Sequence, residues 1–267
     1  MDLNKRMKQY EGCYKTIITP RSYVIIRLDG KNFSKYTKGL DKPFDEGFTD
    51  AMHKTALKLC EYFNAKFAYT QSDEISLLIT DIGGNNNTQP ELGNVLQKLC
   101  SLTASVATAR FNEVRNIQYL MEDANMDPMG PPLPNNTAYF DSRVFVVPNE
   151  DEVFNHMLWR QQDASKNSVS MAAHTHLGHN ATMNKSTSEK QEMLFQEKGV
   201  NWNDYPVKFK RGVVITKETY EKETPMHDGH EFIDVMEKVT RTRWVVNHGT
   251  PIFTENRDYL INLIPTK

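Results

Sequence analysis

The sequence predicts an α+β fold, in which an antiparallel, ferredoxin-like split βαβ sheet carries helices on one face and a mixed helical C-terminal half follows. Short β-branched runs and long amphipathic segments alternate in the order β-α-β-β-α-β over residues 23–147. Hydrophobic residues make up 39% of the 267 positions, which is enough to bury a sizeable core. No stretch approaches the roughly 18 to 20 consecutive apolar residues of a membrane span, so no membrane association is expected.

The first predicted strand, Tyr23 to Asp29, is a β-branched run with apolar residues on both faces, as in a buried central strand. It ends at Asp29-Gly30, which predicts a turn. Apolar residues then recur at helical spacing from Phe44 to Phe63, and Pro43 suits the first position of that helix. The chain is therefore expected to begin with a strand, a loop and an amphipathic helix.

A hairpin, a second helix and a fourth strand complete the predicted sheet. Phe67 to Thr70 and Ile75 to Thr80 are apolar, strand-like runs, and the polar segment Gln71 to Glu74 between them suits a hairpin tip. Leu92 to Val114 repeats apolar residues at helical spacing, and Tyr139 to Val147 is the last strand. Polymerase palms and nucleotidyl cyclases share this architecture, although a fold alone does not determine function.

The Pro-rich stretch Asp127 to Asn136 predicts an extended loop and a boundary between two halves. We expect residues 1–135 to form a palm-like catalytic domain, and residues 136–267 to complete the sheet and contribute helices and RNA contacts. The second half is less regular. Its predicted elements are the helices Glu150 to Lys166 and Thr187 to Lys198 and the strands Val207 to Thr216 and Thr242 to Val246.

Composition limits the compartment and the partners. The formal net charge is −2, so an RNA partner would need a local basic patch, for which the segment Lys185 to Arg211 is the best candidate. The three cysteines, Cys13, Cys60 and Cys100, are odd in number and lack Cys-x-x-Cys spacing. Neither a disulfide framework nor a cysteine zinc site is therefore expected, and a reducing cytoplasm fits the sequence best.

Three carboxylates are predicted to converge at one edge of the sheet. Asp29 ends the first strand, and Asp73 and Glu74 lie on the neighbouring hairpin tip. Mg²⁺ prefers oxygen ligands, and two ions about 3.5 to 4 Å apart can hold a nucleoside triphosphate while stabilising the attacking and leaving oxygens. Each acid taken singly could instead end a strand or solvate a turn. Their joint placement favours a catalytic site with two Mg²⁺ ions.

The segment after Asp29, Gly30-Lys31-Asn32-Phe33-Ser34, is a candidate for holding the triphosphate. A glycine lets the backbone approach a ligand closely, so its carbonyl can face a metal and the following amides can face phosphate oxygens. Lys42 could reach the same phosphates, although an exposed lysine near a helix start is more often only solvated. The loop alone is a weaker signal than a Walker sequence, which the chain lacks.

Five blocks of sequence resemble, in order, the motifs of the tRNA-histidine guanylyltransferase superfamily. The resemblance covers roughly Arg6 to Thr216. The five blocks are Arg27 to Phe33, Tyr69 to Ser76, Phe140 to Arg143, Trp159 to Asp163 and Ser188 to Leu194.

That resemblance implies a palm-like catalytic core, two Mg²⁺ ions bound by Asp29, the Gly30 carbonyl and Asp73, and a homotetramer. It implies that a tRNA 5′-monophosphate is activated with ATP or GTP, that the 3′-hydroxyl of an incoming nucleotide attacks the activated end, and that pyrophosphate is then removed. Positioning and charge neutralisation would supply most of the rate. Ser72 and Glu74 would support the metal-binding aspartate. Positions linked to activation or phosphate handling are Lys42, Asn167 and Lys190.

Two positions depart from the eukaryotic pattern. Eukaryotic members have a histidine where this chain has Ser34, and His-Ile-Asn-Asn where it has Ser165-Lys166-Asn167-Ser168. The chain therefore resembles the guanylyltransferase-like branch of bacteria, archaea and some protists, which favours templated repair of 5′-truncated tRNAs. We expect a template-directed 3′-to-5′ nucleotidyltransferase that prefers GTP and acts in 5′-end repair or in guanylylation of tRNA-His. A nucleotidyl cyclase and a non-catalytic tRNA-binding protein remain alternatives.

Residues of the second half are candidates for tRNA phosphate contacts. Arg160 follows Trp159 in a predicted amphipathic helix, where the tryptophan could equally fill the core. Arginine offers phosphate a bidentate fork. The full set of candidates is Arg160, Asn167, Lys190, Lys208, Lys210 and Arg211.

Overall fold

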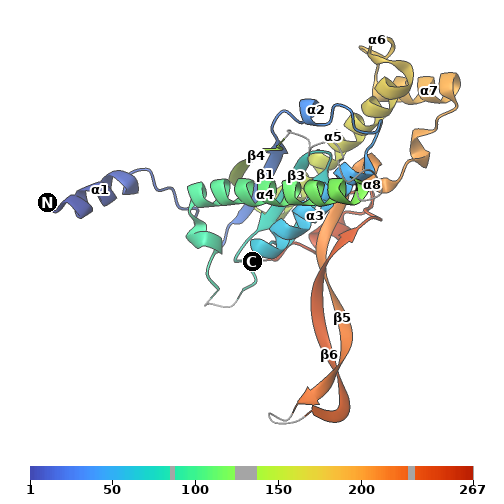
Figure 1. The fold of residues 1–267 in the computed structure, drawn as a ribbon. Helices are drawn as coiled ribbons and strands as arrows, with labels where there is room; N and C mark the ends of the chain where they lie inside the picture. The colour runs from blue at the N-terminus through green and yellow to red at the C-terminus, as the bar shows by residue number, and fades with distance from the viewer. Residues whose placement is uncertain (85–87, 124–136, 228–231, 267) are drawn as a thin grey trace.

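The computed structural model describes residues 1–84, 88–123, 137–227 and 232–266, and its strands form an antiparallel sheet (Figure 1). The strand order is β4-β1-β3-β2-β5-β6. Its part β4-β1-β3-β2 is the predicted split βαβ sheet, so the α+β prediction is confirmed. The strands are β1 (Tyr23–Gly30), β2 (Phe67–Gln71), β3 (Glu74–Ile79), β4 (Phe140–Val147), β5 (Val213–His227) and β6 (Phe232–Asn247).

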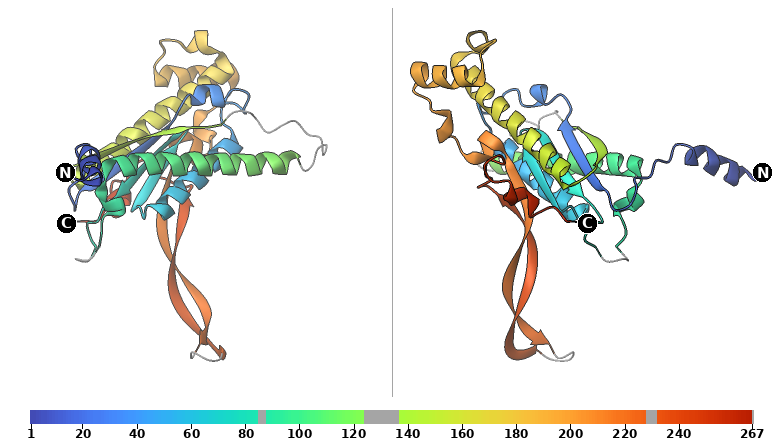
Figure 2. Two further views of the ribbon diagram at one scale, coloured as in Figure 1. Left: turned by 60° about the vertical axis from the view of Figure 1, so that its left-hand side comes forward. Right: turned by 180° about the vertical axis from the view of Figure 1, so that it is seen from behind.

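Helices precede, connect and follow the strands (Figure 2). None of the helices in the described ranges is long and apolar enough to cross a membrane. The α-helices are α1 (Leu3–Gly12), α2 (Phe33–Tyr36), α3 (Glu46–Tyr62), α4 (Leu96–Asp123), α5 (Glu150–Leu177), α6 (His179–Thr182), α7 (Thr187–Lys198), α8 (Val207–Arg211) and α9 (Asp258–Ile261), and the 3₁₀ turns are η1 (Glu91–Asn94) and η2 (Trp202–Asp204).

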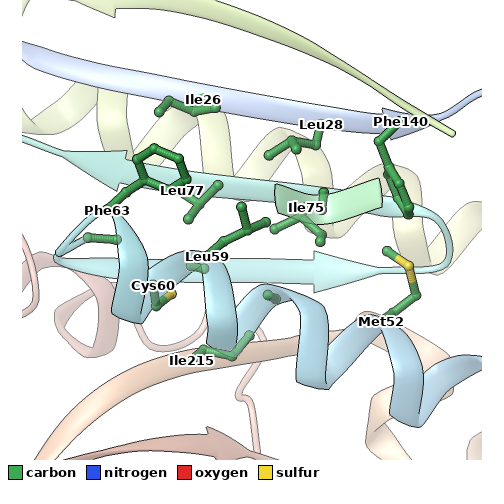
Figure 3. Packing of buried hydrophobic residues seen from close by; sticks show 14 of the residues in the cluster. Ile26, Leu28, Met52, Leu59, Cys60, Phe63, Ile75, Leu77, Phe140 and Ile215 are labelled. Carbon is green, nitrogen blue, oxygen red and sulfur yellow. The ribbon is translucent and has the colours of Figure 1, made fainter. Parts of the chain in front are cut away.

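One face of the sheet is covered by α3 and α4. Ile26 and Leu28 of β1 and Leu77 of β3 belong to this layer, where they meet Leu59 of α3 and Phe63, the residue after α3 (Figure 3). All five side chains are at most 1% exposed. Successive side chains of a strand point to opposite faces, so Ile25 and Arg27, which alternate with Ile26 and Leu28 in β1, face away from this layer.

The opposite face of the sheet is also covered. Tyr23 and Ile25 of β1 lie there with Met157 of α5 and Leu260 of α9. The predicted fold class holds, but the expectation of helices on one face is corrected, because α5 adds a layer on the other. The apolar residues on both faces of β1 were the sequence signal for this layer, since a strand covered on both sides needs them.

The first helix of the sheet begins later than predicted. Helix α3 begins at Glu46 rather than Phe44, because the side chain of Asp45 caps it by accepting a 2.6 Å hydrogen bond from the Phe48 N–H. Pro43 therefore lies in the loop before the helix and not at its first position.

The long helix of the second half continues beyond its predicted end. It was expected to stop at Lys166, but α5 runs on for three further turns. Ala172 and Ala173 of this extension are fully buried against Leu194 of α7. Packing between these two helices stabilises an extension that the sequence pattern of α5 alone did not reveal.

The prediction of a strand from Val207 to Thr216 is wrong for its first five residues, because Val207–Arg211 forms the helix α8. Phe209 of α8 stacks on Phe44 with ring centroids 4.8 Å apart, which holds this turn against the loop before α3. Strand β5 begins only after Gly212, whose φ of +72° is left-handed. A Cβ on Gly212 would lie 2.6 Å from the carbonyl oxygen of Thr70.

Strands β5 and β6 form a long two-stranded ribbon that projects from the body (Figures 1 and 2). The predicted strands Val207 to Thr216 and Thr242 to Val246 covered only its base. β5 pairs with β2 from Ala68 to Thr70 and then continues with β6 alone.

The sheet draws strands from both predicted halves of the chain. β1, β2 and β3 come before the predicted division at residue 135, and β4, β5 and β6 come after it. The Pro-rich segment Asp127 to Asn136, which suggested that division, lies outside the described residues. The division into residues 1–135 and 136–267 stays a prediction.

Candidate active site

Two strand ends and a tight turn bring the predicted carboxylates to one edge of the sheet. Asp29 of β1 pairs in register with Glu74, the first residue of β3. Asp73 lies in the turn between β2 and β3, and its carbonyl accepts a 3.2 Å hydrogen bond from the Gly30 N–H. The structure therefore places Asp29, Asp73 and Glu74 together although more than forty positions separate the two segments.

The turn itself fixes the direction of Asp73. Ser72 has a φ of +51°, a left-handed conformation that is uncommon outside glycine. Its hydroxyl donates a 3.2 Å hydrogen bond to Oδ1 of Asp73. Ser72 thus contacts the carboxylate that the family resemblance implies it supports, and its catalytic role stays a prediction.

The two aspartates are electrostatically unfavourable as free anions. The pKa of the Asp73 carboxyl is raised to about 6, chiefly by burial and also by the negative charge of Asp29, against the lowering effect of its hydrogen bonds. Burial also raises the pKa of Asp29, as do the charges of Glu74 and Asp141. Desolvation and mutual repulsion disfavour the charged forms, so a cation beside the pair would stabilise both carboxylates.

These groups fit a site for a hard divalent cation. Carboxylate and carbonyl oxygens are the ligands that Mg²⁺ prefers, and the predicted set consists of Asp29, Asp73 and the carbonyl of Gly30. Within the described ranges no three His, Cys, Asp or Glu side chains gather as a complete metal-binding group. A set of two carboxylates and one carbonyl leaves other coordination positions to water and to substrate phosphates, which is the usual pattern for Mg²⁺ in phosphoryl transfer.

Glu74 is held by two arginines and is not free to bind a metal. Arg27 forms an ion pair with one carboxylate oxygen of Glu74, and Nη1 of Arg160 lies 2.6 Å from the other. The Arg160 guanidinium also pairs with Asp163 at 3.0 Å and lies 3.8 Å from the centroid of the Trp159 ring. Arg160 is 5% exposed, so the predicted contact between Arg160 and tRNA phosphates is corrected: its side chain serves Glu74 instead.

The sequence reasoning assigned no role to Asp141 and Arg143 on β4. Asp141 pairs in register with Asp29, and Nη2 of Arg143 lies 3.5 Å from Oδ2 of Asp29 and 3.3 Å from Oδ1 of Asp141. Arg143 therefore offsets part of the negative charge at this edge. Both residues lie in one of the blocks that carry the family resemblance, but only the strand register shows that they reach Asp29.

The loop after Asp29 is built around a buried ring. Phe33 is 4% exposed and packs against Phe48, Phe111 and Phe140. A Cβ on Gly30 would lie 2.4 Å from Cδ2 of Phe33, so only glycine fits at the end of β1. Glycine at this position is thus required by the ring of Phe33, and the approach of the Gly30 backbone to a ligand stays a prediction.

The remaining loop residues are placed differently from one another. The Lys31 N–H donates a 2.8 Å hydrogen bond to the carbonyl of Tyr139, so this amide is already engaged. Asn32 is exposed and left-handed, with a φ of +58°. Ser34 is exposed and borders the cavity described next.

A cavity of about 390 Å³ lies beside Asp73. This volume is within the range of small-molecule and cofactor sites. Five residues predicted to bind nucleotide line it, whereas Gly30, Lys31 and Asn32 do not. The five are Phe33, Ser34, Lys42, Ser72 and Asp73.

The rest of the cavity wall could not be predicted from the sequence. Phe44, from the loop before α3, and Phe209, from α8, form a stacked aromatic pair there. His53 of α3 lines the same space, and burial lowers its pKa to about 4, so it is neutral at pH 7. Lys208, predicted as a tRNA contact, also lines the cavity and forms an ion pair with Glu46. These residues come from distant segments without any shared motif.

One further basic candidate, Lys210, is not available for tRNA phosphates in the way the sequence suggested. Lys210 is 7% exposed, and its ammonium group donates to the carbonyl of Asn203, which corrects its predicted role. Arg211 is half-buried, and the 2.7 Å hydrogen bond from the Tyr69 hydroxyl ends on its backbone carbonyl and not on its guanidinium, so its tRNA contact stays a prediction. The basic segment Lys185 to Arg211 is therefore partly used inside the protein.

Asn167 and Lys190 are linked to the site only indirectly, through contacts with residues of α5. The Asn167 amide donates a 3.4 Å hydrogen bond to Asp163, the partner of Arg160, so it is connected to Glu74. Lys190 of α7 donates a 3.0 Å hydrogen bond to the hydroxyl of Ser170. The next residue of α5 after Ser170, Met171, lines the cavity.

Comparison with known proteins gives consistent relatives. Residues 4–148, more than half of the chain, match the family model described as tRNAHis guanylyltransferase. Uncharacterized protein R259 of Acanthamoeba polyphaga mimivirus is 32% identical, over 81% of this chain and 77% of that protein. The tRNA(His) guanylyltransferase of Saccharomyces cerevisiae is 28% identical, over 75% of this chain and 85% of the yeast protein.

Solved structures give the same result over nearly the whole chain. A bacterial tRNA(His) guanylyltransferase (Thg1)-like protein in complex with ATP is 40% identical, covers 98% of this chain and 99% of its own, and has a TM-score of 0.81. A complex of such a bacterial protein with GTP has a TM-score of 0.74 at the same identity, over 98% of each chain. The paired aspartates and the adjoining cavity agree with these relatives. Because the family model matches more than half of the chain, the chain belongs to the tRNAHis guanylyltransferase family.

Proposed function

We propose that this chain is a nucleotidyltransferase that adds nucleotides, with GTP preferred, to the 5′ end of tRNA in the 3′-to-5′ direction. The observation that carries the proposal is the pair Asp29 and Asp73, two desolvated carboxylates beside a cavity large enough for a nucleotide. The family model and the ATP and GTP complexes of the bacterial relatives support it.

In this proposal Asp29, Asp73 and the carbonyl of Gly30 hold two Mg²⁺ ions. Bound there, the ions would neutralise charge on the triphosphate and on the reacting oxygens. The repulsion between the two carboxylates supports the assignment, because the free anions are unfavourable without a cation.

The cavity is proposed to take the base and sugar of ATP or GTP. The stacked pair Phe44 and Phe209 offers an apolar wall, and Lys42 and Lys208 supply positive charge to the same space. Phe33 and Ser34 of the loop Gly30 to Ser34 line this cavity, and the loop would lie beside the triphosphate. In this proposed orientation of the nucleotide, the phosphates would lie next to Asp73.

Glu74 is proposed as a positioning residue. Arg27 and Arg160 form ion pairs with its carboxylate. Its backbone follows Asp73 directly in the sequence and pairs with Asp29 on the neighbouring strand. A rigid Glu74 therefore restrains both aspartates, which reduces the reorganisation needed to reach the transition state. Roles of Asn167 and Lys190 in 5′-end activation belong to the same proposal.

The proposal has three further parts: nucleotide addition directed by a template, a homotetrameric assembly and a cytoplasmic location. Template direction rests on Ser34 and on Ser165-Lys166-Asn167-Ser168, which differ from the histidine-containing eukaryotic motifs. The substrate would be a tRNA that lacks its 5′ nucleotide, as in 5′-end repair, or tRNA-His.

The test is extension of a labelled tRNA that lacks its first nucleotide, with Mg²⁺, ATP and GTP. Wild-type protein should lengthen the 5′ end, and Asp29→Ala or Asp73→Ala should abolish extension while the thermal unfolding midpoint stays close to that of the wild type. Asp258→Ala removes an exposed acid at the start of α9 and serves as the matched control. Full activity in both site variants would refute the assignment. Cyclic nucleotide formed without RNA would instead support the cyclase alternative.

A further inference from the structure

The ribbon formed by β5 and β6 has no role in the proposed chemistry. It begins beside the active site, where Val213 pairs with Thr70 of β2, three residues before Asp73. β5 runs antiparallel to β2, so it leads away from the edge that carries Asp73 (Figure 1). Among the described residues of the ribbon, those of β5 after Ile215 pair with β6 and with no other strand.

The register of the ribbon sorts its side chains into two faces. Glu218 pairs with Arg243, Tyr220 with Arg241, and Lys222 with Val239. Directly paired residues of an antiparallel ribbon share a face, and every second residue along a strand does too. Among the residues whose side chains the structure describes, the charged and aromatic members of this face, here called the Arg241 face, are Glu218, Tyr220, Lys222, Arg241 and Arg243.

The Arg241 face is basic, whereas the other face is neutral. Among the side chains that the structure describes, the Arg241 face carries three cations and one carboxylate. The opposite face carries Lys217 and Lys238 against Glu221 and Glu223. The two faces have similar numbers of charges, so the difference lies in their sign.

The cations of the Arg241 face are not consumed by the protein. Lys222 and Arg241 are exposed, and neither has an ion pair or side-chain hydrogen bond with any residue in the described ranges. Arg243 pairs with Glu218 through Nη2 at 2.5 Å, and its guanidinium lies 5.1 Å from the centroid of the Tyr220 ring, yet its side chain is still 60% exposed. On the other face Lys238 pairs with Glu221 at 3.6 Å, and Lys217 donates to Asn64.

A row of exposed arginine and lysine beside an aromatic ring is the chemistry that recognises a nucleic-acid backbone. At about 3.3 Å per residue, Lys222 lies roughly 30 Å along β5 from Val213, so this surface is well separated from the catalytic carboxylates. In the segment Lys185 to Arg211, which the sequence favoured for RNA, Lys208 is paired with Glu46 and Lys210 donates to the carbonyl of Asn203. The ribbon is therefore the stronger candidate for remote RNA contact.

We propose that the Arg241 face binds the phosphate backbone of the tRNA at a distance from its 5′ end. This inference rests on the proposed function, since it takes tRNA as the substrate. Contacts there would raise affinity for the whole tRNA without touching the reacting groups. A hairpin RNA that carries only the acceptor end and is shorter than the roughly 30 Å reach of the ribbon would not gain from them.

The test compares Arg241→Gln and the double variant Arg241→Gln/Lys222→Gln with Lys238→Gln. Lys238 is the matched control, because it is an exposed cation on the same strand, three residues away and on the opposite face. Binding of fluorescent tRNA and of the short hairpin is measured by anisotropy without nucleotide, at several salt concentrations. Arg241→Gln should weaken tRNA binding roughly fivefold and lower the slope of log affinity against log salt by about one, and the double variant should lose more. The hairpin should bind all proteins alike.

Several results would overturn the inference. They are unchanged tRNA binding in the double variant, equal loss in Lys238→Gln, equal loss on the hairpin, or a changed molecular mass in sedimentation, which would make the ribbon a contact between copies. In extension assays the loss should appear in the KM for tRNA and not in kcat. If the wild type bound tRNA but extended no RNA, the proposed function would fail while the binding comparison would still decide the role of the ribbon.

Discussion

Replacement of Gly30 by alanine is the sharpest test of how the fold builds the site. The added Cβ would lie 2.4, 2.5 and 2.7 Å from three carbons of the Phe33 ring, where ordinary contact begins near 3.4 Å. Either the ring or the end of β1 must therefore move by about 1 Å. The ring has little room, because Phe48, Phe111 and Phe140 surround it with centroids 5.1 to 5.9 Å away.

We expect Gly30→Ala to lose both stability and activity. Overpacking of this kind costs about 1 to 3 kcal/mol, which lowers the unfolding midpoint by roughly 2 to 12 °C in a protein of this size. Gly30 follows Asp29 and donates to the Asp73 carbonyl, so a shift of about 1 Å moves the proposed metal ligands and should reduce kcat roughly a hundredfold. Calorimetry and the tRNA extension assay measure the two effects.

The control is Gly12→Ala, since a Cβ at Gly12 meets no atom within 4 Å. A double variant, Gly30→Ala with Phe33→Leu, removes part of the clash and should be less destabilised than the sum of the single variants by about 1 kcal/mol. Unfolding midpoint and kcat both equal to wild type in Gly30→Ala would refute the reasoning, as would strict additivity in the double variant.

Two further predictions concern buried polar groups. Arg160→Met should lower kcat roughly tenfold and leave the KM for tRNA unchanged, because Arg160 holds Glu74 and is shielded from solvent; a raised KM with normal kcat would instead favour a phosphate contact. Burial lowers the pKa of His156 to about 4. Between pH 6.5 and pH 4 the unfolded chain therefore binds more protons at this residue than the folded protein does. As the pH decreases through this range, the free energy of unfolding should fall by about 1.4 kcal/mol per pH unit because of His156. Urea denaturation at several pH values should show this decline, and His156→Gln should make it shallower; an identical slope in the variant would contradict the assignment.

Local pattern was sufficient for the framework of the site. The β-branched run of β1 and the two runs around the Ser72-Asp73 turn are strong strand signals, and a split βαβ order makes them neighbours. For this reason the meeting of Asp29 with Asp73 could be predicted across more than forty positions. The reach of the ribbon could not, because strands that are solvated on both faces lack the hydrophobic alternation that identifies half-buried strands.

The fate of individual charged side chains was decided only by tertiary structure. Arg160 and Lys210 read in sequence as exposed cations, yet both are buried, because Glu74 and the carbonyl of Asn203 are placed by other segments to receive them. The segment that starts at Val207 is helical and not a strand, because Phe209 stacks on the ring of Phe44. Sequence by itself determined the strands, the turn and the acids they carry, because these depend on neighbours along the chain. The partners of each charge and the walls of the cavity depend on residues that meet only after folding.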